Sequence, residues 1–267
     1  MTTVAQDAKS CCAAAYGSGW ARFLLGDSYH PGGLDLTDRL GTMLGLGAGT
    51  RVLDVAAGPG TSATHLAQRF GCRVTGVDLS ESNVVAARET AMRLGVATLT
   101  DFVVGDAELL PFPDESFDVV VCECALCTFP DKHTAVTEFA RVLRLGGRVG
   151  ISDLTRNGPL PPELDGLLAW IACIADARPL AEYEEYLRIA GFQVDCAEPH
   201  DDALRTFVQQ IRTKLIGVEL LARLRTIDVP TTDLAKARAM VRSAADAVAS
   251  RTLGYALLTG TCFAHMH

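Results

Sequence analysis

Short apolar runs alternate with helical patterns through the middle of this chain of 267 residues. Branched apolar residues dominate five runs, and helical spacing fills three of the stretches between them. The predicted strands are 51–56, 73–79, 101–105, 117–124 and 147–154, and the predicted helices are 61–70, 81–94 and 133–145. A strand, a helix and a second strand in succession form a right-handed crossover that returns to the same sheet. The alternation therefore predicts an α/β fold, with a doubly wound, mainly parallel sheet and helices on both faces.

The rest of the chain adds two strands and several helices to this prediction. Residues 157–163 are rich in Gly and Pro and are expected to form a loop. The expected helices are 164–177, 180–190, 202–224 and 232–250, and the expected strands are 192–197 and 255–262. The last strand is predicted to be the antiparallel edge of a seven-stranded sheet.

The domain organisation follows from these elements. Residues 1–50 are expected to form a helical segment that covers the active site, and residues 51–267 form the main domain. Within that domain, the helices over about 202–250 interrupt the sheet before its last strand and are expected to act as a cap.

Composition limits the partners of the chain. Lys and Arg number 24 against 32 Asp and Glu, which gives a net charge of −8. This balance argues against nucleic acid or an anionic membrane as the main partner, because both favour basic surfaces. No apolar run approaches the ~18 residues that span a bilayer. The first residues lack the pattern of a signal peptide, so a cytoplasmic location is predicted.

The sequence VLDVAAGPGT at Val52–Thr61 is the most specific motif in the chain. It places Asp54 at the end of a strand and small residues, including Ala56, Gly58 and Gly60, in the turn before a helix. Glycine has no Cβ and tolerates positive φ, so a ligand can approach the backbone closely. Dinucleotide-binding proteins use a similar turn, but they prefer the spacing G-x-G-x-x-G.

Acidic residues follow the next strands at the same predicted edge of the sheet. Asp78 ends the second strand, where a carboxylate can accept hydrogen bonds from ribose hydroxyls. Asp106 and Ala107 follow the third strand. This set of motifs, over Val52–Leu154, resembles the class I S-adenosylmethionine-dependent methyltransferases. A dinucleotide-binding Rossmann protein is the alternative.

The resemblance implies S-adenosyl-L-methionine as the cofactor. It implies that the glycine turn holds the methionine part, that Asp78 binds ribose and that Asp106 contacts adenine. The cofactor-binding residues expected on this basis are Asp54, Ala56, Gly58, Gly60, Asp78, Leu79, Asp106, Ala107 and Glu123.

Nine cysteines suggest a second kind of chemistry. They are expected to be reduced, because an odd number would leave one unpaired and nothing indicates export. Cys124 ends the fourth strand, at the edge where ligands bind in open α/β sheets. Cys173 follows the loop after the fifth strand, and Cys11 and Cys12 precede the core. Thiols from three parts of the chain are therefore expected to converge on one pocket.

The contexts of two of these cysteines resemble those of the arsenite methyltransferases. Cys124 precedes Pro130-Asp131-Lys132, and Cys173 lies in a Trp-x-x-Cys segment. The resemblance, over about Val52–Phe192, implies a trivalent arsenical substrate held by Cys124, Cys173 and either Cys11 or Cys12. Thiolates suit a soft centre of this kind. The resemblance also implies a cellular thiol or thioredoxin as the reductant.

Other interpretations of the same residues stay open. Cys124 and Cys127 also fit a redox pair or half of a zinc site, although no second C-x-x-C or histidine stands at ligand spacing. Cys72, Cys196 and Cys262 are expected in the core. His30 is either a loop residue with no role or a catalytic base. Asp153 either is structural or lines the pocket. The functional alternatives are an O- or C-methyltransferase for an organic metabolite and a non-catalytic protein that binds the cofactor or a metalloid.

Overall fold

Seven strands form one sheet in the order β3-β2-β1-β4-β5-β7-β6. The computed structural model describes residues 30–161, 164, 174, 176–223 and 231–263. The pairs between β1, β2, β3, β4 and β5 are parallel, and β7 runs antiparallel to both of its neighbours. The strands are β1 (Arg51–Val55), β2 (Arg73–Asp78), β3 (Thr100–Val104), β4 (Phe117–Glu123), β5 (Leu143–Arg156), β6 (Phe192–Pro199) and β7 (Leu253–Cys262). The predicted α/β fold with a mainly parallel, seven-stranded sheet is confirmed.

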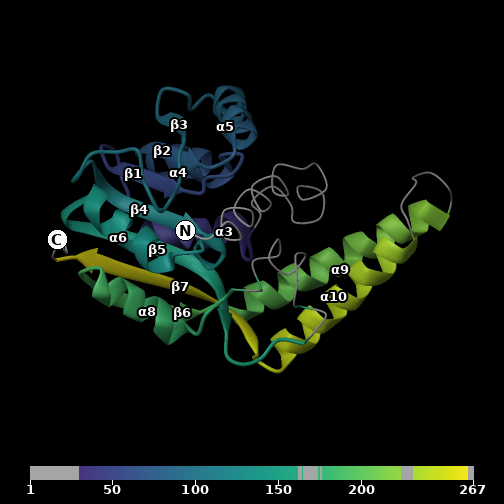
Figure 1. Ribbon diagram of the computed structural model, residues 1–267. Helices are drawn as coiled ribbons and strands as arrows, with labels where there is room; N and C mark the ends of the chain where they lie inside the picture. The colour runs from purple at the N-terminus through teal and green to yellow at the C-terminus, as the bar shows by residue number, and fades with distance from the viewer. Residues whose placement is uncertain (1–29, 162–163, 165–173, 175, 224–230, 264–267) are drawn as a thin grey trace.

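Helices cover both faces of this sheet (Figure 1). Successive residues of β1 show the two cores: Val52 packs in the core that α3, α4 and α5 share, and Leu53 in the core that α6 and α8 share. The helices are α3 (Gly33–Met43), α4 (Thr61–Phe70), α5 (Glu81–Leu94), the 3₁₀ turn η1 (Leu126–Thr128), α6 (Lys132–Val142), α8 (Leu180–Ile189), α9 (Asp201–Arg223) and α10 (Thr231–Ala249). Because strands between two helical layers are buried on both faces, the central strands read as continuous apolar runs.

Three elements differ from the sequence prediction. Helix α6 ends at Val142 instead of residue 145, because Leu143 begins β5. Strand β5 begins at Leu143 instead of residue 147, because the register shifts between Phe117 and Val119 of β4 and lets Leu143 pair with Phe117 before the bulge. The final strand β7 is antiparallel, as predicted, but it is not the edge of the sheet. It lies between β5 and β6, and β6 occupies the edge.

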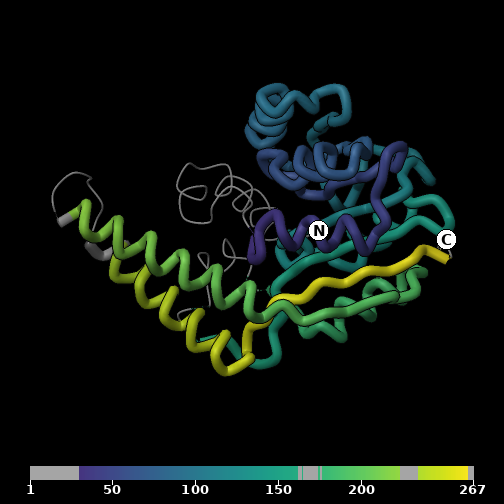
Figure 2. The backbone as a smooth tube through the Cα atoms, turned by 180° about the vertical axis from the view of Figure 1, so that it is seen from behind, coloured from purple at the N-terminus to yellow at the C-terminus, as the bar shows by residue number. Residues whose placement is uncertain are grey.

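Helices α9 and α10 pack against each other as a long pair that projects from one end of the sheet (Figures 1 and 2). Their bounds agree with the helices predicted at 202–224 and 232–250. Their assignment as a cap and the boundary at residue 50 remain predictions. Most of the helix predicted at 164–177 lies outside the described residues. Within the part of the chain that the structure describes, no helix has the length and apolar character needed to cross a membrane.

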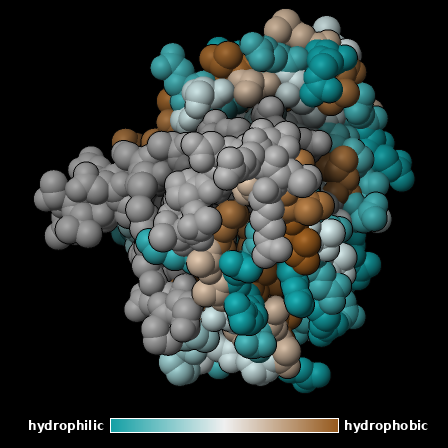
Figure 3. Space-filling view, turned by 90° about the vertical axis from the view of Figure 1, so that its right-hand side faces the viewer, coloured by the Kyte–Doolittle hydropathy of each residue, from teal (hydrophilic) through white to brown (hydrophobic). Residues whose placement is uncertain are grey.

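The surface is not uniformly polar. Large apolar side chains are exposed, among them Ile216 and Leu220 on α9 and Leu79 after β2. Figure 3 shows brown apolar surface in the middle of one face, with teal polar surface beside it.

The order of the strands fixes where a ligand fits. From β1 the chain winds outward through β2 and β3, whereas β4 lies on the other side of β1 and leads to β5. In open α/β sheets, ligands bind beyond the carboxyl ends of the strands at such a switch point. A ligand is therefore expected at the ends of β1, β2 and β4.

Candidate functional site

The turn after β1 combines three residues with positive φ. Ala56, Gly58 and Gly60 have φ values of 59°, 54° and 77°. At Gly60 a Cβ would lie only 2.8 Å from the Cβ of Ala87, so glycine allows the turn to pack tightly against α5. Ala56 adopts a conformation that L-residues rarely hold, and such strain concentrates at functional sites.

Asp78 joins the end of β2 to this turn. Its Oδ2 accepts a hydrogen bond of 2.8 Å from the backbone N–H of Gly58. Its Oδ1 accepts bonds from the N–H of Ser80 at 2.9 Å and from Nδ2 of Asn83 at 3.1 Å. Burial raises the pKa of Asp78, and these donors partly offset the rise. The next residue, Leu79, is 41% exposed and offers an apolar surface beside the carboxylate.

The turn after β3 meets the same edge of the sheet. The N–H of Gly105 donates to the carbonyl oxygen of Asp78 at 3.0 Å, which fixes the two strand ends together. Oδ1 of Asp106 accepts from the N–H of Glu108 at 3.0 Å, and Ala107 is buried beside it. The structure therefore brings the predicted residues Asp78, Leu79, Asp106 and Ala107 to neighbouring positions.

Asp54 is a buried carboxylate at the end of β1. It is 2% exposed, and its Oδ2 has no hydrogen-bond partner within the described residues. Burial raises its pKa well above the ordinary range, and the nearby Glu123 and Asp78 raise it further. A buried acceptor without a donor is unfavourable in the free protein. It is suited to a ligand that brings a hydrogen-bond donor or a positive charge.

We expect Asp54→Asn to stabilise the ligand-free protein by about 1 kcal/mol at neutral pH, or roughly 2–4 °C in Tm. Between the ordinary pKa of a carboxyl group and the raised pKa of Asp54, the folded state binds more protons than the unfolded chain. The free energy of unfolding of the parent protein therefore falls as pH rises through this window. The variant lacks that fall, so its advantage should grow from pH 4 to pH 8 in chemical denaturation. An advantage that shrinks over this range would contradict the assignment.

A cluster around Glu123 closes the end of β4. Thr37 of α3 donates to Glu123, with its Oγ1 3.2 Å from Oε1 and 3.0 Å from Oε2. Ser152 of β5 donates to Oε1 at 3.4 Å and accepts from the hydroxyl of Tyr255 at 3.0 Å. Nε2 of His30 lies 3.7 Å from Oε2. We call these five residues the Glu123 cluster.

His30 is held as a member of this cluster and not as a free loop residue. Its Nδ1 lies 3.1 Å from the carbonyl oxygen of Pro31, which can only accept, so Nδ1 carries a hydrogen. Its Nε2 faces Glu123 and lies 3.4 Å from Oγ1 of Thr37, whose single hydrogen is directed to Glu123. Nε2 is therefore the ring nitrogen that faces the carboxylate of Glu123, 3.7 Å from its Oε2.

Cys124 follows β4 directly. Of the four cysteines predicted to bind the substrate, it is the one that lies within the described residues, and it stands at this edge of the sheet. It is partly exposed, whereas Cys122 and Cys127 are buried. Its φ is 53°, and its N–H donates to the carbonyl oxygen of Ser152 at 2.6 Å. The positive φ ends β4 abruptly at the switch point. Cys173, Cys11 and Cys12 lie outside the described residues.

The other described cysteines divide into core and edge positions. Cys72 and Cys262 are buried, as predicted, and burial raises the pKa of Cys72 to about 11. The prediction for Cys196 is wrong, because this residue is only half-buried on the edge strand β6. No group of three His, Cys, Asp or Glu residues within the described ranges is arranged to hold a metal ion.

Three site residues were missed by sequence reasoning: Thr37, Ser152 and Tyr255. Each belongs to the Glu123 cluster but comes from a distant part of the chain. The hydrogen bond between Ser152 and Tyr255, for example, joins residues 103 positions apart. Local motifs give no sign of such pairs.

Comparisons with known proteins show which family the chain resembles. A family model described as a methyltransferase domain matches residues 53–151. The 27-O-demethylrifamycin SV methyltransferase of Amycolatopsis mediterranei (strain S699) is 38% identical over 61% of this chain and 61% of its own length. The O-methyltransferase resE of Aspergillus sclerotiorum is 31% identical over 69% of this chain and 70% of its own length. The arsenite methyltransferase of Halobacterium salinarum is 33% identical over 58% of this chain and 40% of its own length.

A solved structure extends the likeness over most of the fold. The phosphoethanolamine N-methyltransferase 2 of Haemonchus contortus, in complex with S-adenosyl-L-methionine, superposes with a TM-score of 0.76 and 22% identity. The match covers 94% of this chain and 57% of that chain. The first two curated relatives are matched over only 61% and 58% of their own lengths.

Proposed function

Because the chain belongs to the class I S-adenosylmethionine-dependent methyltransferases, we propose that it methylates a thiol-bound trivalent arsenical, arsenite or methylarsenite. The observation that carries this proposal is Cys124, a partly exposed thiol directly after β4. It stands at the switch point of the sheet, beside the buried carboxylate of Glu123. The likeness to the arsenite methyltransferase of Halobacterium salinarum supports the same acceptor.

The residues at the strand ends fit the cofactor of this family. The glycine turn offers backbone that a ligand can approach, and the Oδ2 of Asp54 is a buried acceptor in need of a donor. We propose that Asp54, Ala56, Gly58, Gly60 and Glu123 hold the methionine part, whose amino group is cationic. Asp78 would bind the ribose, and Leu79, Asp106 and Ala107 would contact the adenine. The bound cofactor supplies a methyl group activated by its sulfonium.

To methylate an arsenical, the protein needs to orient the arsenic atom toward the methyl group. Thiolates of Cys124, Cys173 and Cys11 or Cys12 would hold arsenic as a pyramid and leave its lone pair free to attack the methyl group. Positioning in line with the methyl group is then the main contribution of the protein, and no general base is needed. Reduced thiols favour a cytoplasmic location, with a cellular thiol or thioredoxin as the reductant.

A second candidate function is methylation of a hydroxyl group on an organic metabolite. Two observations favour it: the His30–Glu123 contact of 3.7 Å and the likeness to O-methyltransferases. A hydroxyl acceptor needs a base, and the carboxylate of Glu123 would stabilise a proton taken up by His30.

One assay separates the two candidates. The purified chain is incubated with S-adenosylmethionine and either arsenite or methylarsenite in the presence of glutathione, or with a set of phenols and catechols. Methylated arsenicals, identified by mass spectrometry, would support the main proposal. Turnover of the hydroxyl compounds alone would replace it with the second. Cofactor binding without turnover of either would favour a binding protein.

We expect Asp78→Ala to weaken S-adenosylmethionine binding by on the order of 1–3 kcal/mol, which is about 5- to 150-fold. The change would remove the proposed acceptors for the ribose hydroxyls, and it removes the anchor of Gly58. Isothermal titration calorimetry measures the affinity. The control is Asp101→Ala on β3, which removes an exposed carboxylate at the other end of the neighbouring strand. Equal affinities for the parent and Asp78→Ala would place the ribose elsewhere.

A further inference from the structure

Lys132 is a cation in an unfavourable position. It is the first residue of α6, where the helix dipole favours negative charge, and it is only 4% exposed. The helix already has an N-cap, because the side chain of Asp131 accepts from the N–H of Thr134 at 2.9 Å. Its apolar face is also well packed, with Val136 and Phe139 fully buried. The formation of α6 therefore does not explain a buried lysine at this position.

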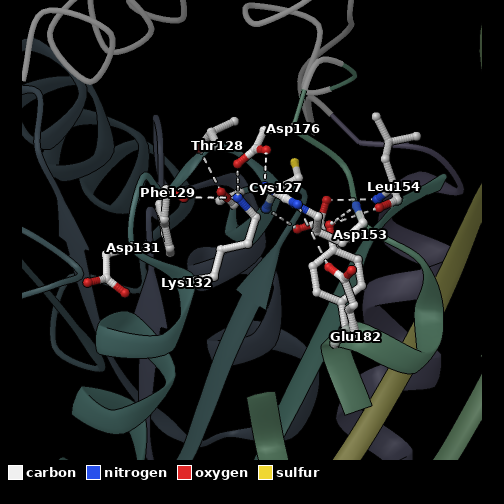
Figure 4. A network of polar contacts seen from close by, with 12 residues as sticks. Cys127, Thr128, Phe129, Asp131, Lys132, Asp153, Leu154, Asp176 and Glu182 are labelled. Carbon is white, nitrogen blue, oxygen red and sulfur yellow. Dashed lines mark hydrogen bonds and ion pairs between the residues drawn. The ribbon is translucent and has the colours of Figure 1, made fainter. Parts of the chain in front are cut away.

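The contacts of Lys132 join two segments that are far apart in sequence (Figure 4). Its Nζ donates to the carbonyl oxygen of Phe129 at 3.0 Å and forms a largely buried ion pair with Asp176. Asp176 also accepts from the guanidinium of Arg178 at 2.6 Å. The ammonium thus connects the chain after β4 to the chain that precedes α8.

Both segments are also tied to the end of β5. The carboxylate of Asp153 accepts from the N–H of Cys127 at 3.0 Å, which holds the η1 turn. On the other side, the N–H of Arg156 donates to the carbonyl oxygen of Arg178 at 3.0 Å. Lys132 closes this arrangement, since its ammonium contacts Phe129 and Asp176 at once. The turn that begins at Cys124 is therefore held between β5 and residues 176–178.

We propose that the Lys132–Asp176 ion pair is a positioning device for the methyl acceptor, which sets the η1 turn, and with it Cys124, against the strand ends. Lys132 and Asp176 are positioning residues and do not touch the reacting atoms. The inference rests on the proposed function only for the identity of the acceptor.

Stability alone is a weak explanation for this pair. Taking two charges out of water offsets much of their attraction, so a buried ion pair is poor evidence of a stabilising role. A residue that is unfavourable for its helix, such as a lysine in the first turn, is expected where function requires that residue. An orientation that is wrong by about 1 Å can lower a rate on the order of a hundredfold. Fixing the turn beside the acceptor can therefore have a large effect on the rate of methyl transfer.

The experiment compares Lys132→Met and Asp176→Asn with a control on the same helix. Arg141→Met removes two ion pairs, with Glu138 and with Asp114, and the hydrogen bonds of Arg141 to the carbonyl oxygens of Leu110 and Phe112, near the other end of α6. All proteins are measured at a temperature where thermal scans show them to be folded. The readouts are kcat/KM for the acceptor that the parent protein methylates, Kd for S-adenosylmethionine, and the rate at which iodoacetamide labels Cys124.

We expect Lys132→Met and Asp176→Asn to lower kcat/KM for the acceptor by about tenfold or more, with Kd for the cofactor within about twofold of the parent. Cys124 should be labelled several times faster in both variants, since the turn is no longer held. Arg141→Met should change none of the three readouts. Equal kcat/KM and equal labelling in Lys132→Met and Arg141→Met would overturn the proposal, as would a parallel loss of cofactor affinity.

The labelling readout needs no acceptor, which keeps this inference separate from the proposed function. If the parent protein methylates only organic hydroxyl compounds, the arsenical proposal fails. Faster labelling of Cys124 in the two variants would still support the positioning role. Turnover of arsenicals with unchanged labelling and kinetics would contradict the positioning role alone.

Discussion

The Cys124→Ser protein is expected to lose arsenical methylation by about a hundredfold or more while it binds S-adenosylmethionine normally. Loss of groups that only support a metal ligand already lowers affinity 10- to 100-fold, so loss of a ligand should exceed this. Oxygen is a harder donor than sulfur and does not replace it for a soft centre. Serine has nearly the same shape, and the φ of 53° at this position is equally strained for either residue. Methylated products and arsenical binding are measured together.

Cys196→Ser is the matched control. It also removes one half-buried thiol, but from the edge strand β6. Its methylation rate should equal that of the parent. Cys173→Ser should behave like Cys124→Ser, and the Cys11→Ser/Cys12→Ser double variant tests the N-terminal pair. If Cys124→Ser and Cys173→Ser both methylate arsenicals at the parent rate, the thiol site is wrong and the organic acceptor takes its place.

The second large effect is expected from Gly58→Val, which should reduce cofactor affinity below detection in calorimetry. In the proposed cofactor site the added side chain would stand between the turn and the cofactor, and its branched Cβ is poorly tolerated at a φ of 54°. Strained backbone would also weaken the bond from the Gly58 N–H to Asp78. Gly58→Ala is the milder variant, with an intermediate loss of affinity if the fold of Gly58→Val is impaired.

Gly95→Val separates backbone strain from steric exclusion. Gly95 has a φ of 72° at the end of α5, and a Cβ there would meet no atom within 4 Å. It should lose stability, by about 1–2 kcal/mol, without losing affinity. Full affinity in Gly58→Val would mean that the cofactor does not approach this turn.

The fold was largely predictable because its signals are local. The apolar run of β4 and the 3.6-residue spacing of α6 are each contained in about ten residues. The position of β7 was not, because its antiparallel pairing with β5 and β6 depends on contacts made across the whole second half of the chain. An apolar strand has the same sequence pattern in the interior of a sheet as it has at a covered edge.

The residues of the site also divide into those with a local sequence signal and those without one. Gly58 and Asp78 belong to short motifs, and the structure brings them within hydrogen-bond distance. Thr37 and Tyr255 reach Glu123 and Ser152 only through tertiary packing, so neither carries a signal in its own neighbourhood. The buried ion pair of Lys132 was equally hidden, since Asp176 lies 44 residues away.

The interior position of β7 has a consequence for how the molecule assembles during synthesis. Strands β1 to β5 can pair as they emerge, but the edge of β5 that faces away from β4 must wait for β7, which is made about a hundred residues later. Until then, β5 and β6 both present unpaired backbone, and Tyr255 has not reached Ser152. The nascent chain would therefore stay vulnerable to edge-to-edge association until its last strand inserts, and that insertion completes the sheet and the site in one step.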